Sequence, residues 1–340
     1  MPLPLHYSAD NRWAKPPGGW SWSEATAVAV DSRDRVHVFN RGSHPVIVFD
    51  RDGNVLSSWG EGQFTRPHGI TIAADDSIFL TDDMGHAVKK FSPDGRLLLT
   101  LGTPGQPSPT GAASLDFRTI RNAAGPFHYP TNVAVAANGD LYISDGYGNA
   151  RIHRFTSDGR LLHSWGEPGS GPGQFHIPHG IAIDAAGIVY VADRENSRIQ
   201  LFSPEGECLR EWPDVARPCQ LAIVKDRFYV AELGYRAGMW PGVAAPANAV
   251  GGRVTIRDKR GTILDWWGGG DNPGTPGDFF APHDISIDSH GDIYVAEVTF
   301  SAGGNRGAIP RDCPSLQKFT RRRDNPNGAS RGATVRERWI

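Results

Sequence analysis

Short apolar runs alternate with turn residues along most of the chain, and residues 174–202 show this pattern most clearly. Three apolar runs lie there, at residues 181–183, 188–192 and 199–202. Runs of β-branched residues this short, separated by turns this tight, are typical of an up-and-down antiparallel meander. The segment therefore predicts consecutive strands of one small sheet.

The same unit occurs six times. The first apolar residues of the six innermost strands are Val28, Ile70, Val133, Ile181, Leu221 and Ile285. A fourth, outermost strand is visible in five units, at residues 55–59, 97–101, 161–165, 208–212 and 263–267. One small sheet cannot bury both of its faces, whereas units of about 40 to 65 residues stacked around an axis can. We therefore expect an all-β fold, a six-bladed β-propeller of four-stranded antiparallel blades.

The repeats predict a single domain over residues 1–340, with a polar N-terminal lead and a polar C-terminal tail. The blades are expected at residues 23–59, 60–101, 128–165, 175–212, 218–267 and 281–319. Residues 3–7 and residues 335–340 are both candidates for the strand that closes the last blade. Three insertions rich in Gly, Pro, Ala or Ser interrupt the array, at residues 103–127, 234–252 and 299–314. Long irregular loops on a rigid scaffold often carry binding surfaces.

Composition narrows the possible partners. The formal net charge of −2 gives no reason to expect nucleic acid or an anionic membrane as a partner. The N-terminus lacks the apolar core of a signal peptide and no run reaches membrane-spanning length, so a cytoplasmic location is expected. The three cysteines, Cys208, Cys219 and Cys313, match no zinc or redox spacing, which predicts free thiols.

Histidine occupies the same position in alternate units. Two places before the first apolar residue, the six units carry Thr26, His68, Thr131, His179, Cys219 and His283. Alternate blades of a six-bladed ring lie about 120° apart, so the three imidazoles would converge on the axis. Three histidines with an open fourth position are the ligand set of a catalytic zinc site. The alternative is that each histidine only caps or hydrogen-bonds a neighbouring loop.

Two arginines and a tyrosine are expected at the rim of the same cavity. Arg41 and Arg194 follow the second strand of their units, and Tyr147 lies near the equivalent place in the third unit. Guanidinium groups bind carboxylates bidentately, so the site would suit a small anionic substrate. A tyrosine whose phenolate is stabilised by arginine or metal can act as a general base. In the alternative, the arginines staple blades together through acidic residues such as Asp82, Asp145 or Glu195.

Other carboxylates near this end have different expected roles. Asp145 and Asp193 end their strands and are expected to hold the turns that follow. Asp284 stands where the other two histidine units have glycine, which puts a carboxylate beside the axis. A lone axial carboxylate needs a partner. Backbone carbonyls from neighbouring inner strands would complete a hard oxygen site for calcium, and a salt bridge to an arginine is the alternative.

These residues resemble the NHL-repeat propellers and, more narrowly, the peptidyl-α-hydroxyglycine α-amidating lyases. The resemblance covers about residues 24–300, and its most specific segments are residues 38–42, 67–70, 144–152, 173–179, 192–200 and 282–285. It implies that zinc is bound by His68, His179 and His283. It implies that Tyr147, Arg41 and Arg194 are catalytic. It also implies a structural calcium ion held by the backbone carbonyls of Val28 and Ile70 and the carboxylate of Asp284.

The reaction that the resemblance implies is the collapse of a carbinolamide to an amide and glyoxylate, without addition of water. The chain departs from the secreted animal lyases at Gly148 and Leu201, where those enzymes have disulfide-bonded cysteines. Both departures agree with a reducing compartment. No monooxygenase domain that would make hydroxyglycine peptides is expected, and the three insertions would reshape the mouth of the site, so a small substrate such as ureidoglycolate is an alternative to a hydroxyglycine peptide. Two other functions stay open: a non-catalytic propeller that binds a protein or polymer, and a calcium-dependent lactonase or esterase of the gluconolactonase type.

Overall fold

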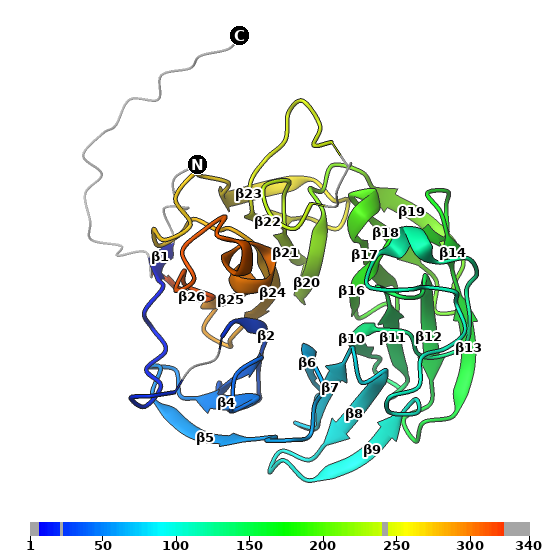
Figure 1. The fold of residues 1–340 in the computed structure, drawn as a ribbon, viewed down its shortest axis with the longest axis horizontal. Helices are drawn as coiled ribbons and strands as arrows, with labels where there is room; N and C mark the ends of the chain where they lie inside the picture. The colour runs from blue at the N-terminus through cyan, green and yellow to red at the C-terminus, as the bar shows by residue number, and fades with distance from the viewer. Residues whose placement is uncertain (1–6, 21–22, 240–243, 323–340) are drawn as a thin grey trace.

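Six four-stranded antiparallel sheets stand around a central axis, as the sequence predicts (Figure 1). The computed structural model of the protein describes residues 7–20, 23–239 and 244–322. Each blade runs from the axis outward in chain order, so its first strand lines the centre and its fourth lies at the periphery. The propeller prediction is confirmed.

The first three blades follow one another without interruption of their strands. Blade one contains β2 (Ala25–Val30), β3 (Val36–Asn40), β4 (Val46–Phe49) and β5 (Val55–Trp59). Blade two contains β6 (Pro67–Ile72), β7 (Ile78–Asp82), β8 (Ala87–Phe91) and β9 (Leu97–Leu101). Blade three contains β10 (Pro130–Val135), β11 (Leu141–Asp145), β12 (Arg151–Phe155) and β13 (Leu161–Trp165).

The second half of the ring has the same order of strands. Blade four contains β16 (Pro178–Ile183), β17 (Val189–Asp193), β18 (Arg198–Phe202) and β19 (Cys208–Trp212). Blade five contains β20 (Pro218–Val224), β21 (Arg227–Glu232), β22 (Arg253–Arg257) and β23 (Ile263–Gly268). Blade six contains β24 (Pro282–Ile287), β25 (Ile293–Glu297), β26 (Leu316–Arg321) and, as its outer strand, β1 (Tyr7–Asp10). The five outer strands predicted from the sequence are observed, β23 being one residue longer.

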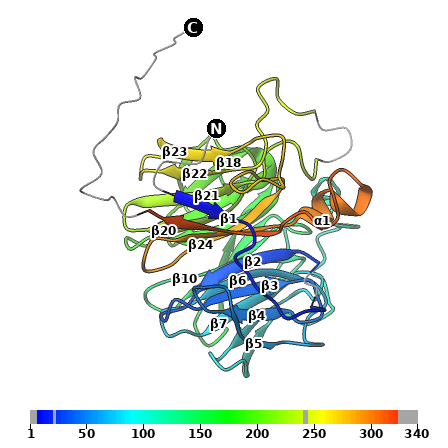
Figure 2. The same cartoon turned by 90° about the vertical axis from the view of Figure 1, so that its left-hand side faces the viewer.

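The ring is closed by its N-terminal strand. β1 pairs with β26 from Tyr7 opposite Arg321 to Asp10 opposite Lys318, and the ring of Tyr7 stacks on Trp267 with centroids 6.0 Å apart. Figure 2 shows β1 lying along the edge of the last blade. Of the expected strand at residues 3–7 the structure describes Tyr7 alone, which begins β1; residues 3–6 and 335–340 lie outside the described residues.

The hydrophobic core lies between neighbouring blades. Phe79 and Val88 of blade two pack with Ile143 and Phe155 of blade three in one buried cluster, and the other blade pairs pack in the same way. Five second strands are buried along almost their whole length because both of their faces meet another blade. This is why they appear in the sequence as near-continuous apolar runs.

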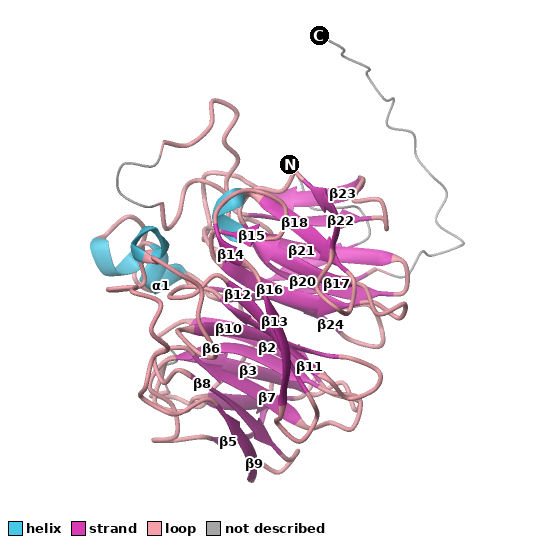
Figure 3. Cartoon of the chain, turned by 90° about the vertical axis from the view of Figure 1, so that its right-hand side faces the viewer, coloured by secondary structure: helices cyan, strands magenta, loops and turns pink. Residues whose placement is uncertain are grey.

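Helical segments are few and short. They are α1 (Thr299–Ala302), η1 (Phe117–Thr119), η2 (Arg194–Asn196) and η3 (Gly304–Arg306), and a two-stranded parallel sheet joins β14 (Glu167–Pro168) to β15 (Gln174–Phe175). The helical turns lie toward one face of the ring (Figure 3). Within the described residues no helix is long and apolar enough to cross a membrane.

All three insertions open onto that face. Residues 103–127 join β9 to β10, residues 234–252 join β21 to β22, and residues 299–314 join β25 to β26. The first strand of each blade runs away from this face and the second returns to it. Connections after the second and fourth strands therefore lie at the end where each inner strand begins. The three insertions and the positions of the axial histidines share this end.

The inner strands approach one another very closely at Gly180. A Cβ atom placed on this residue would lie 2.4 Å from the carbonyl oxygen of Cys219 in the next blade. We expect Gly180→Ala to lower the free energy of unfolding by about 1–3 kcal/mol, because backbone atoms on both sides would have to shift. Urea unfolding measures the effect. Gly18→Ala is the control, since a Cβ there meets no atom within 4 Å. Equal stability of both variants would contradict the close approach.

Candidate active site

Three histidines from alternate blades meet at the axis. His68, His179 and His283 each occupy the second position of their inner strand, and all three are buried. Their ligand nitrogens lie within 4.8 Å of one another, and the ring centroids are 4.6 to 4.9 Å apart. The structure therefore brings together the three residues that the repeat pattern singles out.

Each imidazole is oriented by the blade that follows it. The Nδ1 atoms lie 2.7 to 2.8 Å from backbone carbonyl oxygens, in the pairs His68–Thr131, His179–Cys219 and His283–Thr26. A carbonyl oxygen can only accept a hydrogen bond, so Nδ1 carries the proton in every ring. The lone pair of Nε2 then points toward the axis in all three. A backbone carbonyl partner of this kind is typical of histidines that bind metals.

The nitrogen atoms at the axis suit a metal ion. Burial lowers the pKa of His68 and His179 well below the usual value, and lowers the pKa of His283 to about 3. All three rings are therefore neutral at pH 7. The Nε2 atom of His283 is buried and has no hydrogen-bond partner among the described residues. A buried acceptor of this kind requires a partner, and neutral imidazole nitrogens around an open position fit zinc.

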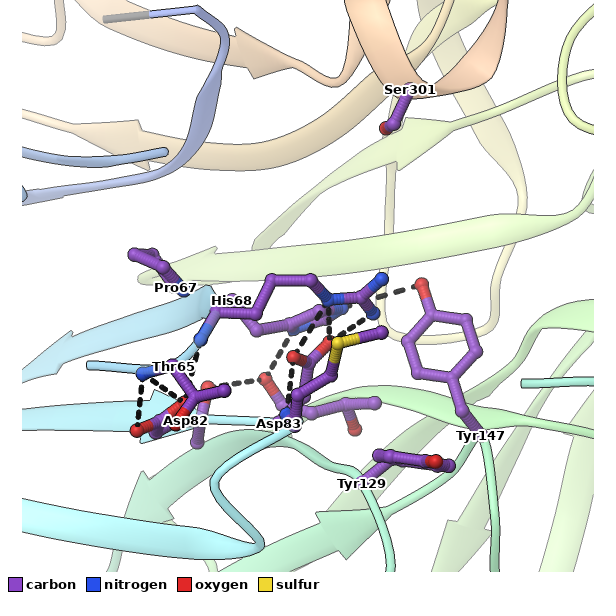
Figure 4. Close-up of polar contacts among 12 residues, drawn as sticks. Thr65, Pro67, His68, Asp82, Asp83, Tyr129, Tyr147 and Ser301 are labelled. Atoms are coloured by element: carbon purple, nitrogen blue, oxygen red, sulfur yellow. Dashed lines mark hydrogen bonds and ion pairs between the residues drawn. The ribbon is translucent and has the colours of Figure 1, made fainter. Parts of the chain in front are cut away.

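Tyr147 lies directly beside this cluster. Its hydroxyl oxygen is 3.3 Å from Nε2 of His68 and 3.1 Å from Nε2 of His179. Nη1 of Arg194 donates a hydrogen bond of 3.1 Å to the same oxygen. Figure 4 shows the hydroxyl of Tyr147 turned toward the middle of the site, with His68 across from it. The phenolic oxygen thus stands between two candidate metal ligands and a guanidinium group.

Arg194 is held by an ion pair that reaches into an insertion. Its Nε donates to Glu195 at 2.8 Å, and Glu195 also accepts from Nη2 of Arg217 at 2.8 Å. Burial alone would raise the pKa of Glu195, but the two guanidinium groups outweigh burial and lower it. Arg217, itself buried, donates to the carbonyl oxygens of Gly234, Ala237 and Gly238. The stem of the insertion at residues 234–252 is thereby fixed to the residue that contacts Tyr147.

Arg41 is fixed in a similar way. Its Nη1 donates to the carboxylate of Glu24, and its Nε donates to the carbonyl oxygen of Pro67 at 3.1 Å. The other oxygen of Glu24 accepts from the backbone N–H of Ser301 at 2.8 Å, at the helix α1. Glu24 therefore joins Arg41 to the insertion at residues 299–314.

The sequence left open that Arg41 and Arg194 pair with acidic residues instead of binding a substrate, and the structure shows which carboxylates they contact. Arg194 does pair with Glu195, whereas the partner of Arg41 is Glu24, which the sequence did not single out. Asp82 and Asp145 do not staple these arginines. They accept backbone N–H groups from the loops before β6 and β10, and Asp193 accepts one from the loop before β16. Asp145 and Asp193 also accept from Asn149 and Asn196 in the turns that follow their strands, as predicted.

A third arginine, Arg66, faces the same site and was not predicted. Its guanidinium carbon lies 5.9 Å from the ring centroid of Tyr147, compared with 5.1 Å for Arg194. Nε of Arg66 donates to both carboxylate oxygens of Asp83, at 2.8 and 3.0 Å. A signal was present in the sequence: an arginine precedes the first proline of the inner strand in two units, at Arg66 and Arg217.

Asp284 lies on the other side of the histidines. A cavity of about 320 Å³ follows the axis there, and Val28, Ile70 and Asp284 all line it. The carboxylate accepts the backbone N–H groups of Val28 at 3.3 Å and Ile285 at 2.8 Å, and burial raises its pKa well above the usual range. Within the described part of the chain no arginine pairs with it. The alternative of a salt bridge is therefore wrong.

Comparisons with known proteins agree with the fold and the repeats. A family model described as NHL repeat matches residues 127–155 and 175–202. NHL repeat-containing protein 3 from Homo sapiens is 33% identical over 309 residues, which cover 86% of this chain and 81% of that protein. Peptidyl-alpha-hydroxyglycine alpha-amidating lyase 2 from Drosophila melanogaster is 27% identical over 323 residues, covering 84% and 71%. A solved streptogramin B lyase superposes with a TM-score of 0.58, covering 93% and 98% of the two chains at 14% identity, which shows the fold alone.

Proposed function

This chain belongs to the NHL-repeat family of β-propellers, and on that premise we propose that it is a zinc-dependent lyase acting on carbinolamides. The reaction is cleavage of the C–N bond of an N-acyl α-hydroxyglycine, which gives an amide and glyoxylate. One observation carries the proposal: the Tyr147 hydroxyl lies between Nε2 atoms of two converging histidines and a guanidinium group. Relatives of this chain include proteins named amidating lyases.

His68, His179 and His283 would hold the zinc ion, which as a Lewis acid would polarise an oxygen of the substrate. Tyr147, as its phenolate, takes the proton from the substrate hydroxyl. Arg41 and Arg194 hold the α-carboxylate of the substrate through their guanidinium groups. As the C–N bond breaks, its electron pair leaves with the amide nitrogen, which then receives the proton from Tyr147. No water is consumed, so the reaction is an elimination.

The proposed substrate is a small anion, either the hydroxyglycine end of a peptide or a compact molecule such as ureidoglycolate. The decisive experiment is an assay for glyoxylate with zinc-loaded protein and synthetic N-acetyl-α-hydroxyglycine, N-benzoyl-α-hydroxyglycine and ureidoglycolate. Release above the spontaneous rate supports the proposal. The absence of release from every carbinolamide, with zinc bound, would overturn it.

We further propose a structural calcium ion held by Asp284 and the carbonyl oxygens of Val28 and Ile70, since oxygen donors of this kind suit that ion. Calcium is then expected to raise the unfolding free energy of the native protein by about 2.7 kcal/mol at a free concentration of about 100 times the Kd. Thermal unfolding in calcium and in EGTA measures this.

The matched variant for the calcium site is Asp284→Asn. It should lose the response to calcium, and in EGTA it should be about as stable as the native protein, because the amide oxygen can still accept the backbone N–H groups of Val28 and Ile285. A native protein that unfolds at the same temperature in calcium and in EGTA would remove the calcium site from the proposal.

A non-catalytic propeller that binds a protein or polymer is the second candidate. A pocket of about 1410 Å³ at the edge of blades one and six favours it, because a pocket of this size can seat part of a partner molecule. Under this function the three histidines could be substituted without loss of binding. A calcium-dependent lactonase ranks third, because it would need acidic or asparagine ligands where this chain has histidines.

All three cysteines are free thiols, which fits the proposed reducing, cytoplasmic location.

A further inference from the structure

The amide that leaves in the proposed reaction needs a hydrogen-bond donor. When the C–N bond breaks, negative charge spreads from the amide nitrogen onto the acyl oxygen. An amide anion is a poor leaving group, so a donor aimed at that oxygen would stabilise the transition state more than the ground state. In the proposed reaction Tyr147 takes the hydroxyl proton, and Arg41 and Arg194 bind the α-carboxylate. None of these three residues is left to bind the acyl oxygen.

Arg66 lies beside the tyrosine that would take the hydroxyl proton. Two guanidinium groups lie over the ring of Tyr147, that of Arg194 at 5.1 Å and that of Arg66 at 5.9 Å from the centroid. The side chain of Arg66 is 20% exposed, while its partner Asp83 is fully buried. Arg66 therefore pairs with a buried carboxylate, while part of its own side chain stays open to solvent.

The hydrogen bonds of Arg66 leave one amino group free. Nε and Nη2 both donate to the carboxylate of Asp83. Nη1 donates to none of the described residues, so two of the five N–H groups of this guanidinium are available to a substrate. Asp83 also accepts the backbone N–H of Met84 at 2.6 Å, which fixes the carboxylate.

This ion pair makes Arg66 a rigid donor. If the guanidinium swung away, it would leave the buried charge of Asp83 without its partner, which is strongly unfavourable. A donor that is already in place costs no reorganisation when charge develops. Because Asp83 balances its charge, Arg66 suits a polar carbonyl oxygen that gains negative charge during the reaction.

We propose that Arg66 is a catalytic residue that stabilises the leaving amide, with Nη1 donating hydrogen bonds to the acyl oxygen as the C–N bond breaks. This inference rests on the proposed lyase function. The hydroxyl proton passes to Tyr147, and the electron pair of the O–H bond forms the second C–O bond of glyoxylate. The C–N pair passes to the amide, and the proton on Tyr147 then returns to the amide nitrogen. Nothing else is consumed.

The role of Arg66 also defines a substrate class. The nitrogen must carry a carbonyl group, as in N-acyl and N-carbamoyl α-hydroxyglycines. Arg66 would not increase the rate of cleavage of a carbinolamine that lacks this carbonyl group.

The test varies the leaving group. Single-turnover rates are measured for Arg66→Gln and the native protein on α-hydroxyglycines that release acetamide, benzamide or trifluoroacetamide. With acetamide, we expect about a 100-fold loss in the variant, as for removal of one oxyanion donor. The loss should be much smaller with trifluoroacetamide, whose anion is already stable. Added guanidinium ion should restore part of the rate of Arg66→Ala. Arg96→Gln, at an exposed position of blade two, is the matched control.

A loss by the same factor for all three leaving groups would overturn the role of Arg66, and so would a change confined to KM. If Arg66→Gln fails to fold or to bind zinc, Asp83→Asn serves in its place. It frees the guanidinium, so a smaller loss with the same dependence on the leaving group is expected, and a uniform loss overturns the role. If the native protein releases no glyoxylate from any of the three compounds, the lyase function itself fails, which is a separate result.

Discussion

Replacing Tyr147 by phenylalanine is expected to lower kcat for glyoxylate release by about 10²- to 10⁴-fold, the usual contribution of a general base. The variant loses only the hydroxyl oxygen that stands between His68, His179 and Arg194. Zinc content should stay the same, because the imidazole nitrogens keep their carbonyl partners. Steady-state kinetics on N-acetyl-α-hydroxyglycine, with metal analysis of the same sample, measures both.

Tyr142→Phe is the control for Tyr147→Phe. Its hydroxyl donates to the carbonyl oxygen of Pro204 at 3.2 Å, in the turn between β18 and β19 of blade four. Loss of that hydrogen bond costs about 0.5–1.5 kcal/mol of stability and should leave kcat unchanged. If Tyr147→Phe retained kcat within a few-fold of the native value, another group would have to take the hydroxyl proton.

The second large effect is expected for the metal. Native protein should contain about one zinc ion per chain, and His179→Ala should lose most of it, because two imidazoles and water bind zinc far more weakly than three imidazoles. Glyoxylate release should fall with the zinc content. Elemental mass spectrometry on untagged protein, before and after incubation with zinc, gives the result directly.

His163→Ala is the matched control for the metal, because His163 is exposed on the outer strand of blade three. It should keep the zinc and the activity. If the native protein does not bind zinc even after incubation with it, or if His179→Ala keeps its zinc, the lyase mechanism would be excluded. The protein-binding propeller would then become the leading function.

The arrangement of strands was predictable because the same pattern is repeated six times. Each unit restricts the register of the others, and Val55–Trp59 and Leu161–Trp165 were placed to the residue. The closing strand occurs once and has no repeat to align with, so residues 8–10 of β1 (Tyr7–Asp10) were not predicted. The three histidines were identified because they alternate with Thr or Cys at one equivalent position of the six units.

The residues that hold the arginines of the site in place were not predictable from the sequence. Glu24 and Ser301 meet at Arg41 although they are 277 residues apart, and Ser301 lies in an irregular insertion without periodicity. Arg66 has an equivalent arginine in only one other unit, Arg217, and no other unit carries an acidic residue at the position of Asp83, so an alignment of units did not single out this pair. Such contacts depend on how the loops fold over the ring, which hydrophobic periodicity does not describe.

The closure of the ring by β1 has a consequence for how the chain is made. Ser8 and Thr320, which meet across the last pair of strands, are 312 residues apart, so β1 leaves the ribosome long before its partner β26 is made. During that interval the other blades can stack in order, but β1 has no partner and the final sheet has an open edge. Unpaired edges invite pairing with other chains. Nascent chains that stall before residue 316 are therefore expected to depend on chaperones more than the finished protein does.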